Sequence, residues 1–212
     1  MKERNKVEVI FKKLYRCFGP QCWWPADTAF EVIVGAILTQ NTNWQNVSKA
    51  IDNLKIAKAL SPGKLRFLPV RRLAALIKPS GYFNIKAGRL KSFLDFLFQK
   101  YNGSLKKMFG RNLDTLRKEL LQVKGIGPET ADSILLYAGN FPIFVVDAYT
   151  KRIFSRKKIV DEKADYRQVQ EMFMQNLKKD VKLYNEYHAL IVRLGKEICK
   201  KNKPKCRICP IK

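Results

Sequence analysis

Three of the five cysteines in this chain stand close together near its C-terminal end. Cys199, Cys206 and Cys209 are separated by six and two residues. Cysteines at such short spacings in a protein without a visible secretory signal are typical of metal ligands, because disulfides are rare in reducing compartments. We therefore expect a metal site in this loop, and three cysteines with one further ligand could hold zinc. Cys17 and Cys22 lie far away in the sequence, and we expect them to be buried thiols.

A glycine turn in the middle of the chain could bind phosphate. Gly125 and Gly127 follow one predicted helix, and Pro128 opens the next, where its missing N–H would have had no partner. The two glycines permit positive φ and a close approach of the backbone to another molecule. Free N–H groups at a helix start suit a phosphate oxygen, and Lys124 adds a positive charge beside them. The turn therefore predicts DNA phosphate binding, and an ordinary helix corner with a glycine C-cap is the alternative.

The charge of the chain indicates the same kind of partner. Its 212 residues include 42 Lys and Arg against 18 Asp and Glu, which gives a net charge of +24. Adaptation to heat would raise Lys and Glu together, whereas most of these bases cannot be paired. A polyanion, most commonly nucleic acid, is the expected partner, and a basic surface with no particular role is the alternative. The bases are densest over 151–158 and 196–212.

The elements that must position these residues are helices. Hydrophobic residues form 46% of the chain, which excludes intrinsic disorder as its main state. Apolar residues recur at helical spacing, and Phe30–Leu38 is apolar on all sides, as in a buried helix. Glycine and proline breaks divide the chain into roughly ten helices. Ile143–Val146 is the one strand-like run and is too short to build a sheet. We expect an all-α protein without a membrane span, located in the cytoplasm and associated with the nucleoid.

At the glycine turn the chain resembles a known family. Gly125-Ile-Gly127, then Thr130-Ala131, then an apolar run ending in Asp147 resemble the helix-hairpin-helix DNA glycosylases of the endonuclease III superfamily. The resemblance extends from about Trp23 to Cys209. It implies a base-excision enzyme that acts as a monomer on damaged double-stranded DNA.

The resemblance also implies a division into two helical domains with the active site in the cleft between them. The expected six-helix barrel domain covers 26–132 and ends in the hairpin. The expected second domain combines 1–25 with 133–212 and carries the cysteine loop at 199–209.

The resemblance assigns roles to individual residues. In the family, a glutamine in the loop after the buried helix fills the gap left by an extruded nucleotide, and Gln40 matches it; a residue that only caps a helix end is the alternative. The residues expected to contact DNA are Gln40, Asn41, Lys124, Gly125, Gly127 and Thr130.

Asp147 matches the catalytic aspartate of the family. It follows the apolar run that ends at Val146 and opens a predicted helix that begins at Ala148. An N-cap carboxylate is held rigidly by backbone N–H groups, which also favour its ionised form. Cleavage of an N-glycosidic bond develops positive charge on the sugar, which a fixed carboxylate can stabilise. Asp147 could be only an N-cap, and the two roles are compatible.

Residue 129 departs from part of the family. Members that also cut the DNA backbone carry a lysine just before the Thr-Ala pair, and it forms a Schiff base. Here that position is Glu129, eighteen residues before Asp147. Because a carboxylate cannot form an imine, we expect a monofunctional glycosylase. Glu129 could instead complement the helix dipole or belong to the base pocket.

The segment Trp23-Trp24-Pro25 suits a damaged base with a positive charge. Adjacent tryptophans can stack on a flipped cationic base, and this run resembles the 3-methyladenine DNA glycosylase III branch. A tryptophan pair in a core or domain interface is the alternative. We expect a base pocket of Trp23, Trp24, Pro25 and Glu129 and alkylated purines as substrates. An endonuclease III-like glycosylase and lyase on oxidised pyrimidines or mismatches, and a non-catalytic DNA-binding protein, are the alternative functions.

The cysteine spacing also resembles a family feature. Cys199, Cys206 and Cys209 match the first three positions of the endonuclease III iron–sulfur loop, so the resemblance implies a [4Fe–4S] cluster. The fourth cysteine would fall at position 215, whereas the sequence ends at Lys212. An outside ligand, a sequence that is slightly short, and a loop that no longer binds iron are the three possibilities. His188, on the apolar helix before the loop, is more simply a packed core residue than a ligand.

Overall fold

The computed structural model describes residues 3–212, and the described chain is all-α, as expected. Twelve α-helices are present among these residues, against the roughly ten expected. Ile143–Val146 forms no strand. No helix among the described residues is long and apolar enough to cross a membrane.

The chain folds into two compact units. One unit covers Ala26–Gly139, and its boundary lies a few residues beyond the expected position 132. The other combines the N-terminal part of the chain, up to Pro25, with Asn140–Lys212. The Ala26–Gly139 unit contains α2 (Ala29–Leu38), α3 (Trp44–Ile56), α4 (Pro62–Phe67), α5 (Val70–Leu76), α6 (Phe83–Tyr101), α7 (Leu105–Phe109), α8 (Leu113–Leu121) and α9 (Pro128–Ser133). The other unit contains α1 (Glu3–Phe18), α10 (Ala148–Arg156), α11 (Tyr166–Asn176) and α12 (Val181–Glu197).

Helix α2 forms the centre of the Ala26–Gly139 unit. Every residue of Phe30–Leu38 is buried, which confirms the prediction from its all-round apolar pattern. Helices α3, α6 and α9 pack around it, and α9 continues into a short π-helix, Ile134–Ala138. The Thr28 side chain caps the start of α2 by accepting a hydrogen bond from the backbone N–H of Glu31 at 3.1 Å.

A buried lysine fixes the end of α2. The Nζ of Lys86 donates to the carbonyl oxygens of Leu38 at 2.8 Å and Ser80 at 2.5 Å. Burial, followed by the nearby charge of Arg89, lowers the pKa of Lys86 to about 8. Carbonyl groups at a helix C-terminus lack partners within the helix, so this lysine satisfies one of them. It thereby fixes the point where the chain leaves α2 for the loop that contains Gln40.

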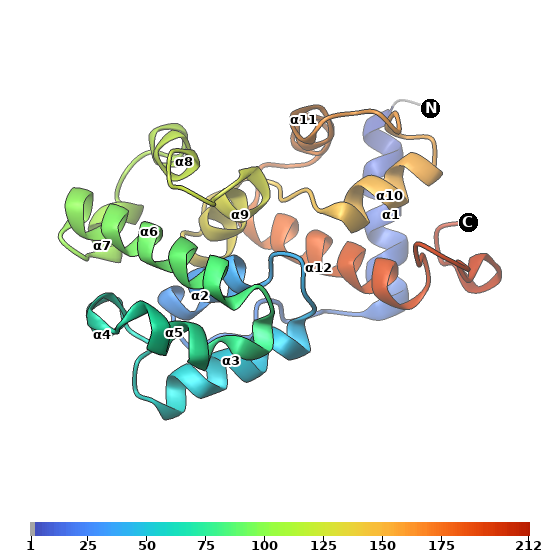
Figure 1. Ribbon diagram of the computed structural model, residues 1–212. Coiled ribbons are helices and arrows are strands. Elements are labelled where there is room, and N and C mark those ends of the chain that lie inside the picture. Colours follow the sequence, from blue (N-terminus) through green and yellow to red (C-terminus); the bar gives the residue numbers. More distant parts are fainter. Residues whose placement is uncertain (1–2) are drawn as a thin grey trace. The chain divides into compact units, whose positions relative to one another are not determined.

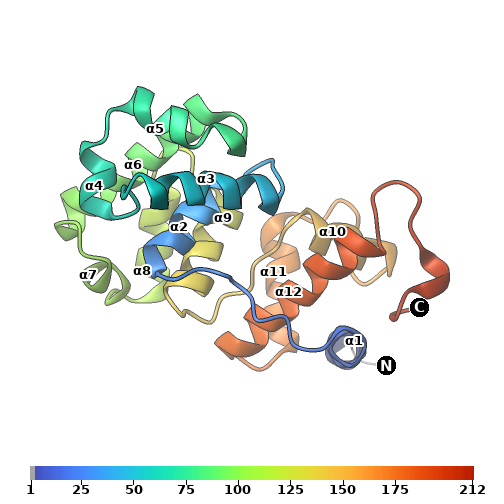
Figure 2. The same cartoon turned by 90° about the horizontal axis from the view of Figure 1, so that it is seen from below.

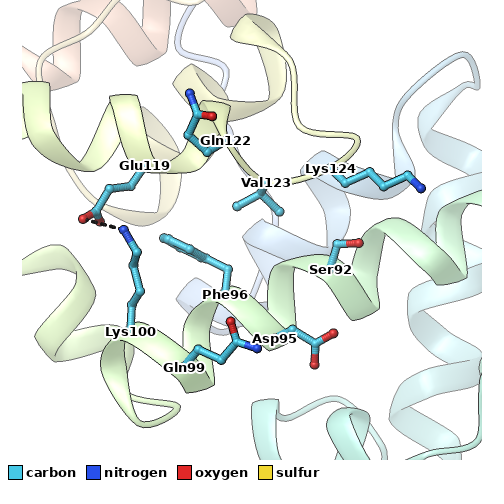
Figure 3. Close-up of a pocket in the computed structure, with 9 residues that line it drawn as sticks. All are labelled: Ser92, Asp95, Phe96, Gln99, Lys100, Glu119, Gln122, Val123 and Lys124. Atoms are coloured by element: carbon cyan, nitrogen blue, oxygen red, sulfur yellow. Dashed lines mark hydrogen bonds and ion pairs between the residues drawn. The ribbon is translucent and has the colours of Figure 1, made fainter.

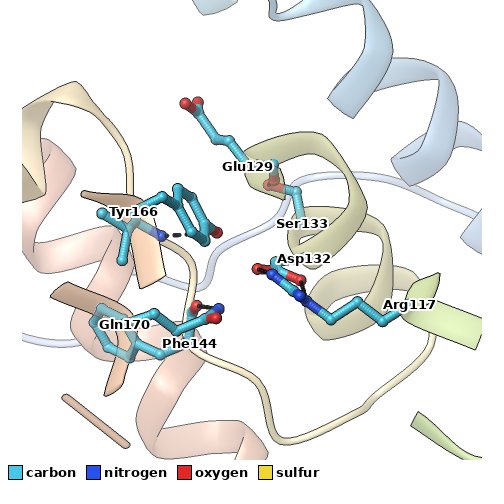
Figure 4. A network of polar contacts seen from close by, with 8 residues as sticks. Arg117, Glu129, Asp132, Ser133, Phe144, Tyr166 and Gln170 are labelled. Carbon is cyan, nitrogen blue, oxygen red and sulfur yellow. Dashed lines mark hydrogen bonds and ion pairs between the residues drawn. The ribbon is translucent and has the colours of Figure 1, made fainter. Parts of the chain in front are cut away.

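Aromatic side chains build the core of the other unit. The rings of Phe144 and Phe173 stack with centroids 4.0 Å apart, and Tyr187 of α12 packs edge-on against both. The Tyr187 hydroxyl donates to the Val7 carbonyl of α1 at 2.8 Å, and α1 crosses α12 at a steep angle (Figures 1 and 2). The Gln170 side-chain amide of α11 donates to the Phe144 carbonyl at 2.6 Å (Figure 4). These contacts anchor the chain just before Asp147.

An ion pair braces the two helices of the glycine hairpin. Arg117 of α8 donates to both carboxylate oxygens of Asp132 on α9, at 2.6 and 3.0 Å (Figure 4). The Asp132 side chain is fully buried, whereas that of Arg117 is partly exposed. Two-pronged bonding of this kind fixes both the distance and the orientation of the helices.

We expect Asp132→Asn to destabilise the protein by about 3 kcal/mol, because it breaks a buried ion pair while the arginine stays in place. Urea unfolding measures the change. Glu171→Gln is the matched control, because it removes an exposed pair between Arg167 and Glu171 on α11. Loss of that exposed pair should leave the free energy of unfolding unchanged. Equal effects of the two substitutions would show that the hairpin does not depend on the brace.

Candidate active site and DNA-binding hairpin

Asp147 is the N-cap residue of α10, as the sequence predicted. Its Oδ1 accepts hydrogen bonds from the backbone N–H and the hydroxyl of Thr150, at 2.7 and 2.8 Å. Its side chain is 11% exposed. The cap bonds and the burial hold the carboxylate in one orientation at the start of the helix.

His188 faces the other oxygen of this carboxylate. Its Nε2 lies 3.6 Å from Asp147 Oδ2, and the imidazole is 7% exposed on α12. The burial of His188 confirms our expectation that it packs in the core. Its contact with Asp147 was not foreseen, because no local pattern connects two residues so far apart in the sequence.

The surroundings of Asp147 favour its ionised form. Burial raises the pKa of the Asp147 carboxyl, but the neighbouring His188 imidazole and the two donors of Thr150 lower it. The net effect is a pKa below the ordinary value of an aspartate. Asp147 therefore carries a full negative charge at neutral pH, as a group that stabilises a developing cation must.

The two expected base-stacking tryptophans belong to the same unit as Asp147. Trp23 and Trp24 are half-buried, and their rings meet edge to face with centroids 5.3 Å apart. Pro25, which follows them, is exposed. Cys17 and Cys22 are both exposed, so our prediction that they are buried thiols is wrong. Both lie at solvent-facing positions, one on α1 and the other in the segment after it.

The hairpin has the predicted turn, with one difference between its glycines. Gly125 has a φ of +89°, and a Cβ there would lie 2.4 Å from Cγ of Arg89. Gly127 has a φ of −92° and is the residue before Pro128, which opens α9. Only Gly125 therefore uses the positive φ that both glycines permit. Gly127 and Lys124 are exposed, so the backbone at the helix start is open to solvent.

Gln40 is connected to this hairpin rather than projecting freely. Its Nε2 donates to the Gly125 carbonyl at 3.0 Å and to the Thr130 hydroxyl at 2.8 Å. Arg89 of α6 donates to its Oε1. Asn41 beside it is exposed and has a positive φ of 55°. Thr130, an expected DNA contact, is buried and uses its hydroxyl to hold Gln40.

Glu129 lies at the exposed first turn of α9. Its backbone carbonyl accepts a hydrogen bond from the Ser133 hydroxyl at 2.7 Å, and the side chain is drawn away from this bond in Figure 4. An acidic side chain at this place complements the helix dipole, so that interpretation is compatible with the structure.

A surface pocket of about 320 Å³ lies between α6 and α8 (Figure 3). Of the residues expected to function in this unit, only Lys124 lines it. The Lys100 and Glu119 side chains form an ion pair at 3.1 Å across one end. Its mixed polar lining offers no aromatic pair for a base, and we do not assign the base pocket to it.

The cysteine loop is held by two arginines of α10. Arg152 donates to the carbonyl oxygens of Cys199 and Gly195, and Arg156 donates to those of Lys200 and Lys201. Arg156 also approaches the Cys199 sulfur at 3.5 Å. Among the side chains that the structure describes, no three His, Cys, Asp or Glu gather as metal ligands. The metal site expected at Cys199, Cys206 and Cys209 stays a prediction.

The two hairpin glycines make a matched pair for mutation. We expect Gly125→Ala to lower the thermal stability clearly, because alanine at positive φ costs about 1–2 kcal/mol and its Cβ would collide with Arg89. Gly127→Ala should leave stability unchanged, since its φ is ordinary and its Cβ meets open space. If the backbone at Gly127 approaches phosphate, the Gly127→Ala variant should nevertheless bind duplex DNA less tightly. Fluorescence anisotropy measures this affinity. Equal stability of both variants would contradict the assignment of the turn.

Comparisons with known proteins agree with this arrangement. Residues 34–179 match the family of HhH-GPD superfamily base excision DNA repair proteins. A protein of Methanocaldococcus jannaschii, provisionally named a DNA repair glycosylase, is 50% identical over all of this chain and 97% of its own length.

Two solved structures share the fold over nearly their full length. A Helicobacter pylori 3-methyladenine DNA glycosylase bound to 1,N6-ethenoadenine aligns with a TM-score of 0.79 and 29% identity, covering 93% of this chain and 98% of that one. A trapped endonuclease III–DNA covalent intermediate aligns with a TM-score of 0.85 and 22% identity, covering 100% and 94%. The chain belongs to the HhH-GPD superfamily and is a base-excision-repair DNA glycosylase with the endonuclease III-like fold.

Proposed function

We propose that this glycosylase removes alkylated purines such as 3-methyladenine by hydrolysis and leaves the DNA backbone intact. The observation that carries the proposal is the pair of carboxylates at its two candidate positions. Asp147 supplies a rigid anion, and Glu129 stands where lyases of the family carry a lysine. A carboxylate can stabilise a sugar cation but cannot form an imine with it.

The proposed reaction begins with extrusion of the damaged nucleotide from the duplex. Gln40, held at the hairpin, would occupy the vacated space, while the hairpin backbone and Lys124 bind phosphate. Trp23 and Trp24 would stack on the flipped base, and the attraction is greatest for a base with positive charge. Such a base also leaves readily, so the protein need not protonate it.

Asp147 would then act on the sugar. As the C1′–N bond of the nucleotide lengthens, its electron pair moves to the base and positive charge develops on the sugar ring. The ionised carboxylate stabilises that charge or orients the water whose oxygen bonds to C1′. The attacking water loses a proton to the carboxylate or to solvent, and the products are the neutral free base and an abasic site.

Similarity to known proteins supports the substrate class. The Helicobacter pylori structure described above is that of a 3-methyladenine glycosylase with a purine adduct bound, and it is 29% identical to this chain. The cluster predicted from the cysteine spacing stays a prediction, and no step of this reaction requires it.

We expect Asp147→Asn to slow release of 3-methyladenine from duplex DNA by on the order of a hundredfold or more, because it removes the charge that stabilises the sugar cation. Trp24→Ala should also slow release strongly. Affinity for the undamaged duplex should stay nearly unchanged in both. Asp165→Asn is the control, because Asp165 caps α11 as Asp147 caps α10. Undiminished base release by Asp147→Asn would exclude the proposed role, and release only of oxidised pyrimidines from a lesion panel would favour the alternative substrate class.

Borohydride trapping tests the absence of a Schiff base. We expect no covalent protein–DNA adduct from the unaltered protein and a detectable adduct from Glu129→Lys, which places an amine at the matching position. A Lys124→Gln variant controls for reaction of the neighbouring native amine. An adduct formed in good yield by the unaltered protein, with strand cleavage, would contradict the monofunctional mechanism.

A further inference from the structure

The chain contains a single histidine, and that histidine faces the proposed catalytic carboxylate. Its imidazole is buried, and its Nε2 lies 3.6 Å from Asp147 Oδ2. This distance is in the range of an ion pair and slightly longer than a direct hydrogen bond. A buried imidazole beside a buried carboxylate is costly unless the two groups satisfy each other, so chance packing is a poor explanation.

The two oxygens of Asp147 have different partners. Thr150 supplies both of its donors, the backbone N–H and the hydroxyl, to Oδ1. Oδ2 has no part in the helix cap and faces His188. Thr150 thus holds the carboxylate through Oδ1 alone. A contact at Oδ2 from a second helix adds a restraint on the other side of the group.

The aromatic core fixes the distance between the two residues. Phe144, shortly before Asp147, packs against Tyr184 and Tyr187 at centroid separations of 5.6 and 6.0 Å. Both tyrosines are within one turn of His188 on α12. The same cluster therefore supports the carboxylate and the imidazole, and α10 packs directly against α12. The contact therefore lies against the packed aromatic core of the unit.

We propose that His188 is a positioning residue that orients Asp147 Oδ2 for the reaction. The inference rests on the proposed function of Asp147. A carboxylate displaced or turned from the developing cation loses much of its effect, and a 1 Å misplacement can cost about a hundredfold in rate. His188 does not need to touch the DNA to exert this control.

Variants of the histidine separate positioning from simple packing. We expect His188→Leu, which keeps an apolar side chain in place, to reduce the single-turnover rate of 3-methyladenine release by about tenfold to a hundredfold. Affinity for the duplex should not change, because a group that acts only in the transition state affects only the chemical step. His188→Gln can present an amide N–H to Oδ2 and should recover much of the rate. Wild-type rates in both variants would overturn the proposal.

Nuclear magnetic resonance provides a readout that depends neither on activity nor on whether the His188→Leu variant folds. The single histidine gives one set of imidazole signals, so its surroundings can be followed without assignment. In Asp147→Asn these signals should shift, whereas in the control Asp165→Asn they should not. Unchanged signals in Asp147→Asn would show that the contact is absent in solution and overturn the inference. Shifted signals together with undiminished base release by Asp147→Asn would instead contradict the proposed function and leave the contact intact.

Discussion

The carboxylate of Asp147 is shielded from water and still has to keep its charge. Burial alone would raise its pKa and favour the neutral acid, which stabilises no cation. Donors from Thr150 and the neighbouring His188 outweigh that effect. The Thr150 donors depend on the exact start of α10, because a helix that began one residue later would direct the N–H of Thr150 elsewhere. The aromatic core packs around Phe144, just before that start, so hydrophobic packing supports an electrostatic property.

A comparable dependence governs the glycine hairpin of the Ala26–Gly139 unit. Gly125 leaves room for the Arg89 side chain, and Arg89 and the hairpin together hold Gln40. The expected wedge and the expected phosphate site are therefore parts of one hydrogen-bonded group. Because Asp132 and Arg117 fix the angle between the hairpin helices, a movement of the hairpin would move Gln40 with it.

Local patterns in the sequence predicted much of this arrangement, but they did not reveal the contacts between distant segments. The Asp147 cap, the helix start at Pro128 and the buried helix α2 each follow from a few neighbouring residues. The hydrogen bond from Gln40 to Thr130 spans 90 residues, and the contact of His188 with Asp147 joins two helices that packing alone brings together. The exposed Cys17 and Cys22 were misassigned because a cysteine carries no periodic signal of its own. A metal site depends on the convergence of its ligands, so the one expected from the cysteine spacing stays a prediction.

In the proposed function, leaving-group chemistry connects the electrostatics of Asp147 to the choice of substrate. A neutral base must gain a proton as it departs, whereas an alkylated purine already carries the positive charge that protonation would add. An enzyme whose main tool is one fixed anion near the sugar therefore accelerates loss of cationic bases most easily. Tryptophan faces attract the same cations, so binding and departure favour one class of lesion. Selectivity of this kind arises from the charge of the base rather than from a hydrogen-bond pattern, which permits several alkylated purines to share one site.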